Sequence, residues 1–173
     1  MTNETIRPYV LFMFMFWGVG AMDALEEFIL EAKSHCYIGR GPKNRQSCRP
    51  GSHDLSFQKA NFSYLDSYFG GTDFMGQETV WRDEIPVWGM NYYGKILKDD
   101  LLTAEMAGRI ITTSLQALYQ QGRFLGGFQQ EVEGFHYSDH SEGSYQRFTG
   151  VETIRLNTTL LYQFDYHGGM IRP

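Results

Sequence analysis

Residues 62–97, FSYLDSYFGGTDFMGQETVWRDEIPVWGMNYYGKIL, carry the clearest structural pattern in this chain. Apolar and aromatic residues alternate with polar ones, and this period of two is typical of β-strands. Two interruptions divide the pattern, the pair Gly70-Gly71 and the four residues 82–85 before Pro86. Short turns of this kind join antiparallel neighbours. The stretch therefore predicts an antiparallel meander of three strands, at about 62–69, 74–82 and 87–97.

Helical periodicity precedes and follows this meander. Apolar residues recur every three or four positions from Asp23, whose side chain suits an N-cap, to about residues 35–38. The same period covers residues 103–121, where Thr103 suits the N-cap and Gly122 suits the position after the last turn. The sequence predicts one helix in each segment.

Strands return in the last third of the chain. They are predicted at 128–137, 144–150, 151–157 and 160–167, with Asn157-Thr158 as the final hairpin turn. No internal repeat is evident and no linker divides residues 22–173, so these residues are expected to form one domain. We expect an α+β fold, in which a mostly antiparallel, curved sheet of six or seven strands has two helices packed on one face.

The composition excludes several classes of protein. With 42% hydrophobic and 16% aromatic residues and a net charge of −5, the 173-residue chain is not intrinsically disordered. The negative charge argues against nucleic-acid binding, and no run of about 20 apolar residues could span a membrane. Cys36 and Cys48 are too few for a disulfide scaffold, and the sequence leaves open whether they pair. We expect a cytoplasmic protein with reduced cysteines.

The first 21 residues form a separate segment. Residues 9–17, YVLFMFMFW, are the most apolar run of the chain and have the length of the apolar core of a signal peptide. Their bulky aromatic rings, and Glu4 close to Arg7, argue against that interpretation. Because Met22 is followed by a helical pattern, it resembles a start of its own, and we favour an upstream start codon as the origin of residues 1–21. A signal peptide and a packed or interface segment are the alternatives.

Five motifs occur in order along the chain: RPGSHDL (49–55), YLDSYFGG (64–71), GQETVW (76–81), PVWGMNYYG (86–94) and HGG (167–169). This series resembles a bacterial family of unknown function, whose members are short stand-alone proteins or the C-terminal part of helix-turn-helix regulators. The resemblance covers about residues 23–170. It implies a ligand-sensing or partner-binding role, without DNA contact by this chain, whose two predicted helices are far apart in the sequence.

The first strand of the meander carries the most suggestive polar residues. Alternation places Tyr64, Asp66 and Tyr68 on one face, and Glu78 of the next strand can share it. Two carboxylates flanked by phenol rings make a pocket suited to a cationic or planar ligand. They would also serve as an acid–base pair if burial raised one pKa. The alternative is structural, with Asp66 hydrogen-bonded to the backbone or to a neighbouring tyrosine inside the sheet.

The densest aromatic cluster lies in and just before the third strand of the meander. Trp88 points to one face, and Asn91 and Tyr93 point to the other. Most of these aromatic side chains are expected in the core. Asn91 is unusual among them, because a buried amide needs hydrogen-bond partners. We therefore assign Asn91 and Tyr93 to the pocket, with Trp81 or Trp88 as its wall.

A basic loop is predicted at residues 39–54. Arg49 and His53 lie on either side of Pro50-Gly51, where exposed N–H groups would join the guanidinium in holding an anion. The alternative is an ion pair of Arg49 with Asp54 or Asp66 that pins the loop onto the sheet.

Two groups of metal-ligand residue types have unsuitable spacings. They are His35, Cys36, Cys48 and His53, and His136, Asp139, His140 and Glu142. The first group matches no compact zinc motif. The second lies on a predicted strand, where residues four apart are not brought together as they are on a helix. We predict neither a metal nor a cofactor.

Together these patterns favour a small-molecule-binding or sensor-like module with its pocket on the concave, aromatic-rich face of the sheet. The expected ligand-binding residues are Tyr64, Asp66, Tyr68, Glu78, Trp81, Trp88, Asn91 and Tyr93. The first alternative is a protein that forms a homodimer or docks a partner through a sheet edge or its N-terminal apolar segment. The second is an enzyme in which Asp66 or Glu78 works with His167 in acid–base catalysis.

Overall fold

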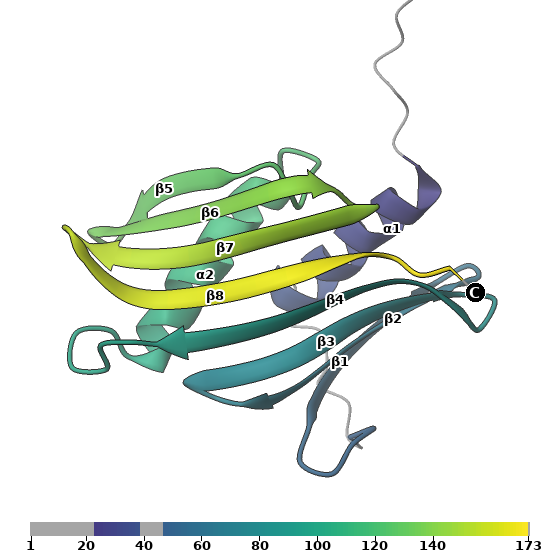
Figure 1. Ribbon diagram of the computed structural model, residues 1–173, viewed down its shortest axis with the longest axis horizontal. Helices are drawn as coiled ribbons and strands as arrows, with labels where there is room; N and C mark the ends of the chain where they lie inside the picture. Colours follow the sequence, from purple (N-terminus) through teal and green to yellow (C-terminus); the bar gives the residue numbers. More distant parts are fainter. Residues whose placement is uncertain (1–22, 39–46, 173) are drawn as a thin grey trace, which may run out of the picture.

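An antiparallel sheet of eight strands forms the body of the part that the structure describes, residues 23–38 and 47–172 (Figure 1). The structure is a computed structural model, and the predicted origin of residues 1–21 lies outside the described residues. The strand order is β1-β2-β3-β4-β8-β7-β6-β5. The strands are β1 (His53–Lys59), β2 (Phe62–Gly70), β3 (Asp73–Arg82), β4 (Ile85–Ile96), β5 (Phe128–Val132), β6 (Phe135–Ser144), β7 (Arg147–Leu156) and β8 (Thr159–Met170).

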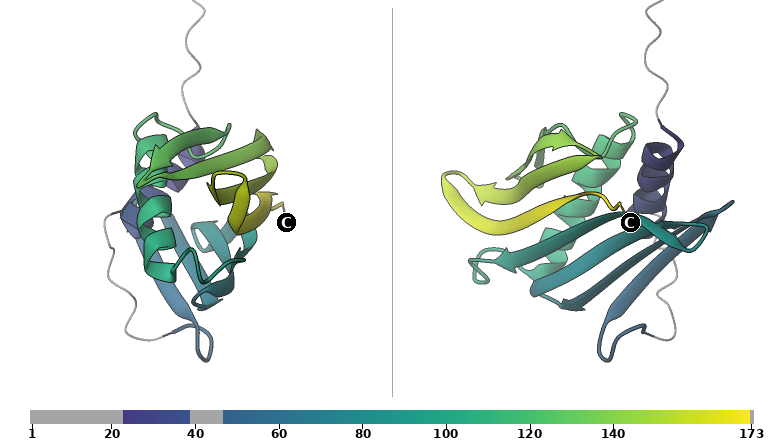
Figure 2. Two further views of the ribbon diagram at one scale, coloured as in Figure 1. Left: turned by 90° about the vertical axis from the view of Figure 1, so that its left-hand side faces the viewer. Right: turned by 45° about the vertical axis from the view of Figure 1, so that its right-hand side comes forward.

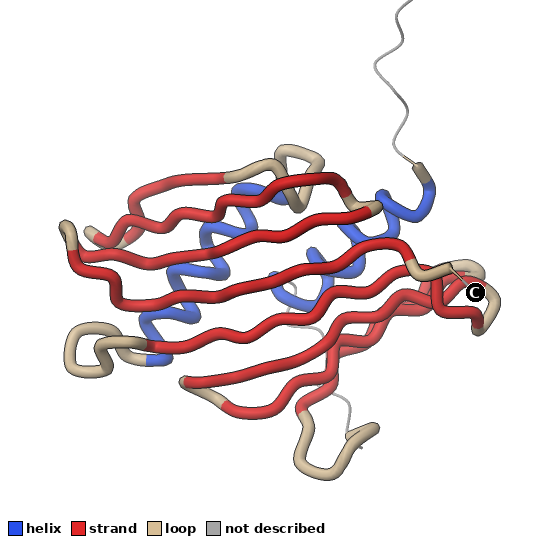
Figure 3. Tube along the Cα trace, in the orientation of Figure 1, coloured by secondary structure: helices blue, strands red, loops and turns tan. Residues whose placement is uncertain are grey.

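Both described helices pack on the same face of this sheet, which bends around them (Figure 2 and Figure 3). They are α1 (Ala24–Lys33), which continues as the π-helical turn η1 (Ser34–Ile38), and α2 (Ala104–Tyr119). The two predicted N-caps are confirmed, because the side chains of Asp23 and Thr103 accept hydrogen bonds from backbone N–H groups of the first turn. The α+β class is confirmed as well. Neither helix is both long enough and apolar enough to cross a membrane.

The prediction of six or seven strands is wrong. From the sequence, no strand is predicted at β1: the predicted basic loop includes His53 and Asp54, and the seven residues of β1 offer only Leu55 and Phe57 as an apolar face. The segment 128–137 is two strands, β5 and β6, joined by a tight turn in which Glu133 and Gly134 have φ of 53° and 82°. Conversely, 144–150 and 151–157 belong to one strand, β7.

Gly150 explains why β7 looks interrupted in the sequence. A Cβ at this position would lie 2.1 Å from the ring of Tyr166 on β8, so that ring occupies the space over the glycine. Gly76 in β3 serves Tyr92 of β4 in the same way, with 2.4 Å from a Cβ to the tyrosine oxygen. Both glycines are required by a neighbouring ring and not by a turn.

The two halves of the chain repeat each other, so the prediction of no internal repeat is wrong. Each half is a helix followed by a four-stranded meander, α1 and η1 with β1–β4 and α2 with β5–β8. The pattern F-x-Y-x-D opens both β2 and β6, and F-x-G-x-E-T recurs in β3 and β7. The repeat is hard to recognise because the helices and the loops that follow them differ in sequence and length.

The halves meet at the centre of the sheet. There β4 pairs with β8, and Tyr92 stands opposite Tyr166, which occupies the same position of the other repeat. An approximate twofold axis therefore passes between these two tyrosines. The axis places β1 and β5 at the two outer edges and relates β2 and β3 to β6 and β7.

Candidate functional site

A cavity of about 370 Å³ lies between the helices and the face of the sheet that they cover. Its walls are mostly apolar and aromatic, as is usual for small-molecule sites. Exposed residues of the β2–β3 turn, Gly71 and Thr72, and of the first half of α2, Ala104 and Gly108, also line it. The cavity therefore opens to solvent between this turn and α2.

Four carboxylates line the cavity, in two pairs related by the internal repeat. Asp66 of β2 stands opposite Glu78 of β3 and forms the first acid pair. Asp139 of β6 stands opposite Glu152 of β7 and forms the second acid pair. All four side chains belong to buried residues, with relative exposures of 6% or less. In each half, the aspartate of F-x-Y-x-D pairs with the glutamate of F-x-G-x-E-T on the neighbouring strand. The two side chains therefore lie on the same face of the sheet.

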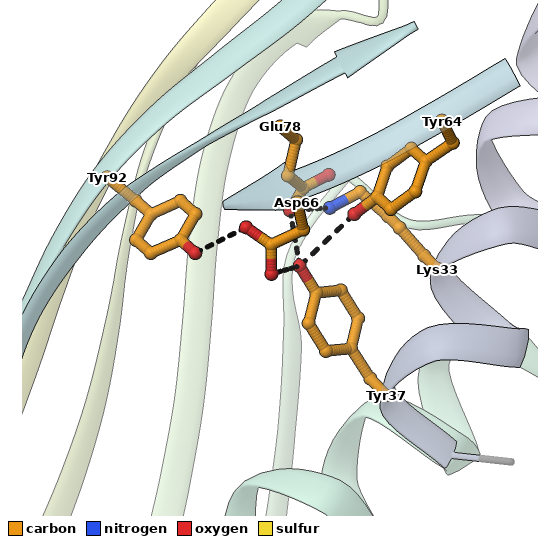
Figure 4. Close-up of polar contacts among 6 residues, drawn as sticks. All are labelled: Lys33, Tyr37, Tyr64, Asp66, Glu78 and Tyr92. Carbon is orange, nitrogen blue, oxygen red and sulfur yellow. Dashed lines mark hydrogen bonds and ion pairs between the residues drawn. The ribbon is translucent and has the colours of Figure 1, made fainter. Parts of the chain in front are cut away.

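The first acid pair is held by side chains from β4, η1 and α1 (Figure 4). Tyr92 of β4 donates to Asp66 Oδ1 at 2.6 Å. The Tyr37 hydroxyl of η1 lies 2.9 Å from both Asp66 Oδ2 and Glu78 Oε1. Lys33 of α1 donates to Glu78 Oε1 at 2.7 Å. Helix and sheet are thereby joined through buried polar contacts.

Counting hydrogens assigns a proton to this network. The Tyr37 hydroxyl has one hydrogen and can donate to only one of the two carboxylates that approach its oxygen. The other carboxyl makes a hydrogen bond to Tyr37 only if it carries a proton itself. Burial, with the charge of Glu78 as the second cause, raises the pKa of Asp66 to about 7. Asp66 is therefore the group that holds a proton near neutral pH.

The second acid pair has a similar arrangement of tyrosines. Tyr166 donates to Asp139 Oδ1 at 2.6 Å, and Tyr137 donates to Glu152 Oε2 at 2.6 Å. Burial raises the pKa of Glu152 to about 7, although hydrogen bonds from Tyr137 and Tyr162 lower it. Burial also raises the pKa of Asp139. Both halves of the cavity thus hold carboxyl groups that ionise near neutral pH.

Two carboxylate oxygens in the cavity have no hydrogen-bond partner among the described residues. They are Glu78 Oε2 and Asp139 Oδ2, one in each acid pair. Lys33 is the one basic side chain among the described lining residues. A buried carboxylate oxygen without a partner is energetically costly. These two oxygens therefore favour the binding of a group that brings hydrogen-bond donors and positive charge.

Some of the sequence-predicted site residues come together here. Asp66, Tyr68 and Glu78 line the cavity, as expected from strand alternation. Tyr64 is 1% exposed and approaches the cavity only through its hydroxyl, 3.2 Å from that of Tyr37. Trp88 is fully buried among core residues and donates its indole N–H to the Tyr145 carbonyl at 2.9 Å, so it is no wall of this cavity.

The other three predicted residues lie on the opposite face of the sheet. Asn91 accepts a hydrogen bond from Gln77, and Tyr93 is 45% exposed. Trp81 and Asn91 line a separate, open groove on that face. Placing these residues in one pocket with Asp66 is therefore wrong. Alternation divides the aromatic cluster correctly, but nothing in the local pattern says which half faces the helices.

Arg49 and His53, from the described part of the basic loop, do not line the cavity, and neither does His167. Arg49 donates to Ser67 and lies 4.5 Å from the centre of the Phe69 ring, and among the described residues it forms no ion pair with Asp54 or Asp66, so anion binding by Arg49 stays a prediction. His53 packs against Tyr68 outside the cavity lining. His167 is exposed on the uncovered face, opposite Asn91, and does not converge with the acid pairs.

Asp54 also helps to anchor the basic loop. Burial opposes its ionisation, but hydrogen bonds from the Cys48 N–H and the hydroxyls of Ser52 and Ser67 lower the pKa of Asp54 to about 2.

Cys36 and Cys48 are both free thiols. Within residues 23–38 and 47–172, no three His, Cys, Asp or Glu side chains are grouped as metal ligands would be.

Sequence reasoning missed several groups of the site. They are Lys33, Tyr37, Tyr92, Asp139, Glu152 and Tyr166. The repeated F-x-Y-x-D and F-x-G-x-E-T patterns would have revealed the second acid pair from the first. No local signal identifies Lys33 and Tyr37, since their role depends on how the first helix docks on the sheet.

A comparison of the chain with known protein families gives a match that covers the cavity carboxylates. A family model described as a domain of unknown function (DUF5680) matches residues 66–171, which include all four cavity carboxylates. The match confirms the resemblance to a family of unknown function. No curated protein and no solved structure matches the chain.

Proposed function

The chain belongs to this family of unknown function, and we propose that it is a small-molecule-binding module whose cavity takes a compact cationic molecule. The observation that carries the proposal is the imbalance of charge in the cavity. Even with Asp66 protonated, three further carboxyl groups, Glu78, Asp139 and Glu152, face one basic side chain, and two of their oxygens have no partner among the described residues. A ligand with a positively charged N–H group would supply both the charge and the donors.

The walls of the cavity suit such a ligand. Tyrosine rings from η1, β4, α2 and β8 surround the acid pairs, and the faces of such rings attract cations. The protein already holds one ammonium group in this way, since Lys33 Nζ lies 5.6 Å from the ring centres of both Tyr37 and Phe124. The apolar remainder of the walls would contact the uncharged part of the ligand.

The proposal is tested by thermal unfolding with four matched compounds: benzylamine, benzamidine, benzyl alcohol and benzoate. The two cations are expected to raise the melting temperature, because a ligand at about 100 times its Kd adds roughly 2.7 kcal/mol of stability. The neutral and anionic compounds are expected to have no such effect. Equal stabilisation by benzyl alcohol, or none by either cation, would contradict the proposal.

One variant and its control locate the effect in the cavity. Asp139→Asn removes the charge of a buried carboxylate whose Oδ2 has no partner among the described residues, and it is expected to abolish the stabilisation by the cations. Asp165→Asn makes the same chemical change on the exposed, uncovered face of β8 and is expected to leave it unchanged. A sensor-like role, a cytoplasmic location and the alternative of a homodimer stay predictions.

A further inference from the structure

The internal repeat indicates where in the cavity a cation is missing. In the first half, Lys33 donates to Glu78, and Tyr37 follows four residues later and contacts the same carboxylate. In the second half, Tyr119 lines the cavity from the end of α2, as Tyr37 does from η1. Four residues before Tyr119 stands Leu115, which also lines the cavity. The second half therefore has the tyrosine of this arrangement and lacks its ammonium group.

We propose, on the basis of the proposed function, that the ligand is a primary amine whose ammonium group binds beside the second acid pair, in the place that corresponds to the Lys33 ammonium beside the first. The site of this ammonium is called the second-half subsite and consists of Asp139, Glu152 and Tyr119. In the first half Lys33 already supplies an ammonium group to Glu78 Oε1, although Glu78 Oε2 has no partner among the described residues.

An independent observation supports the subsite. Asp139 is 5% exposed, and its Oδ2 has no partner among the described residues, whereas its Oδ1 accepts from Tyr166. An ammonium group with three N–H donors can reach Asp139 Oδ2 and the Glu152 carboxylate of the opposite strand together. Both of these carboxylates belong to the same cavity wall, so one small group can serve both.

The geometry of Lys33 also sets the chemical class of the ligand. Lys33 Nζ makes a short hydrogen bond of 2.7 Å to its carboxylate, besides its contacts with aromatic rings. A quaternary ammonium ion has no N–H and keeps only the ring contacts. We therefore expect benzylamine to bind at least about tenfold more tightly than benzyltrimethylammonium.

The decisive experiment places a tethered ammonium group in the second-half subsite. In the full chain, Leu115→Lys is expected to weaken benzylamine binding at least about tenfold in isothermal titration calorimetry, because its own side chain occupies the subsite. Leu115→Met keeps the apolar volume and serves as the matched control, with a Kd within about twofold of the wild type. Circular dichroism checks that both variants are folded.

Each outcome separates the inference from the function on which it rests. If the wild type binds no amine, the proposed function fails. If the wild type binds benzylamine and Leu115→Lys binds it equally well, or Leu115→Met loses it equally, only the subsite assignment fails. Should Leu115→Lys not fold, Asp139→Asn and Glu78→Gln decide the matter. The subsite requires Asp139→Asn to weaken binding more, and an equal or opposite order overturns it.

Discussion

The ligand-free protein is expected to lose stability as the pH rises from about 5 to 8. The pKa of Asp66 is raised from 3.8 to about 7 in the folded chain, and that of Glu152 from 4.5 to about 7, in both cases first by burial. Between these pH values the folded state holds protons that the unfolded chain has released. Stability therefore falls with rising pH until both groups are ionised in both states.

The magnitude follows from the two shifts. At about 1.4 kcal/mol per pKa unit, ionisation in the folded state costs about 4 kcal/mol for Asp66 and about 3 kcal/mol for Glu152. The cost is absent below about pH 4, is acquired between about pH 4 and 7, and stays constant above. This is a large part of the stability of an ordinary domain.

Urea unfolding followed by tryptophan fluorescence at pH 5, 6, 7 and 8 measures this dependence. Asp66→Asn and Glu152→Gln are each expected to flatten the slope and to exceed the wild type in stability at pH 8 but not at pH 4. Asp165→Asn, on the uncovered face, serves as the control and should follow the wild type. A wild-type stability that is constant or rises from pH 5 to 8 would refute the reasoning.

Three further predictions concern the scaffold, and urea unfolding measures each of them. Gly150→Ala forces a Cβ against the Tyr166 ring and should cost about 1–3 kcal/mol, whereas Gly108→Ala, with open space in mid-helix, should stabilise by roughly 0.5–1 kcal/mol. Equal effects would mean that the ring does not need the glycine. Trp88→Phe removes a buried N–H donor and leaves a cavity, and it should lower the free energy of unfolding by about 2–4 kcal/mol. A decrease below about 0.5 kcal/mol would contradict the core role of Trp88. Asp54 has a pKa lowered to about 2, so its stabilising effect is lost as the pH falls from about 4 to 2. Asp54→Asn should therefore reduce the loss of stability over this pH range. An unchanged loss of stability would argue against the hydrogen bonds of Asp54.

Local patterns predict the starts of both helices and the strands β2–β4 well. The N-caps at Asp23 and Thr103 and the alternation in β2–β4 are properties of neighbouring residues, so they are visible without tertiary information. The single strand β7 is predicted as two strands because Gly150 looks like a break. The Tyr166 ring on β8 requires a glycine at this position, and only the pairing of β7 with β8 reveals this contact.

The same distinction applies to the site. Asp66 and Glu78 were predicted because a two-residue period and a short turn fix their shared face. Asn91 and Tyr93 were misplaced because alternation defines two faces but does not say which one the helices cover. Lys33 could not be found, since its contact with Glu78 spans a helix and a strand whose docking depends on the whole core.

The repeat has a consequence for how this architecture could originate and diverge. A single unit of one helix and four strands, paired with an identical copy about the axis between Tyr92 and Tyr166, would build the same sheet from two chains. In such a symmetric ancestor every side chain occurs twice, so a lysine in one half requires a lysine in the other. In one chain that carries both copies the two positions can differ, as Lys33 and Leu115 do. The joined chain can therefore keep a symmetric framework and still present two chemically different ends to whatever enters it.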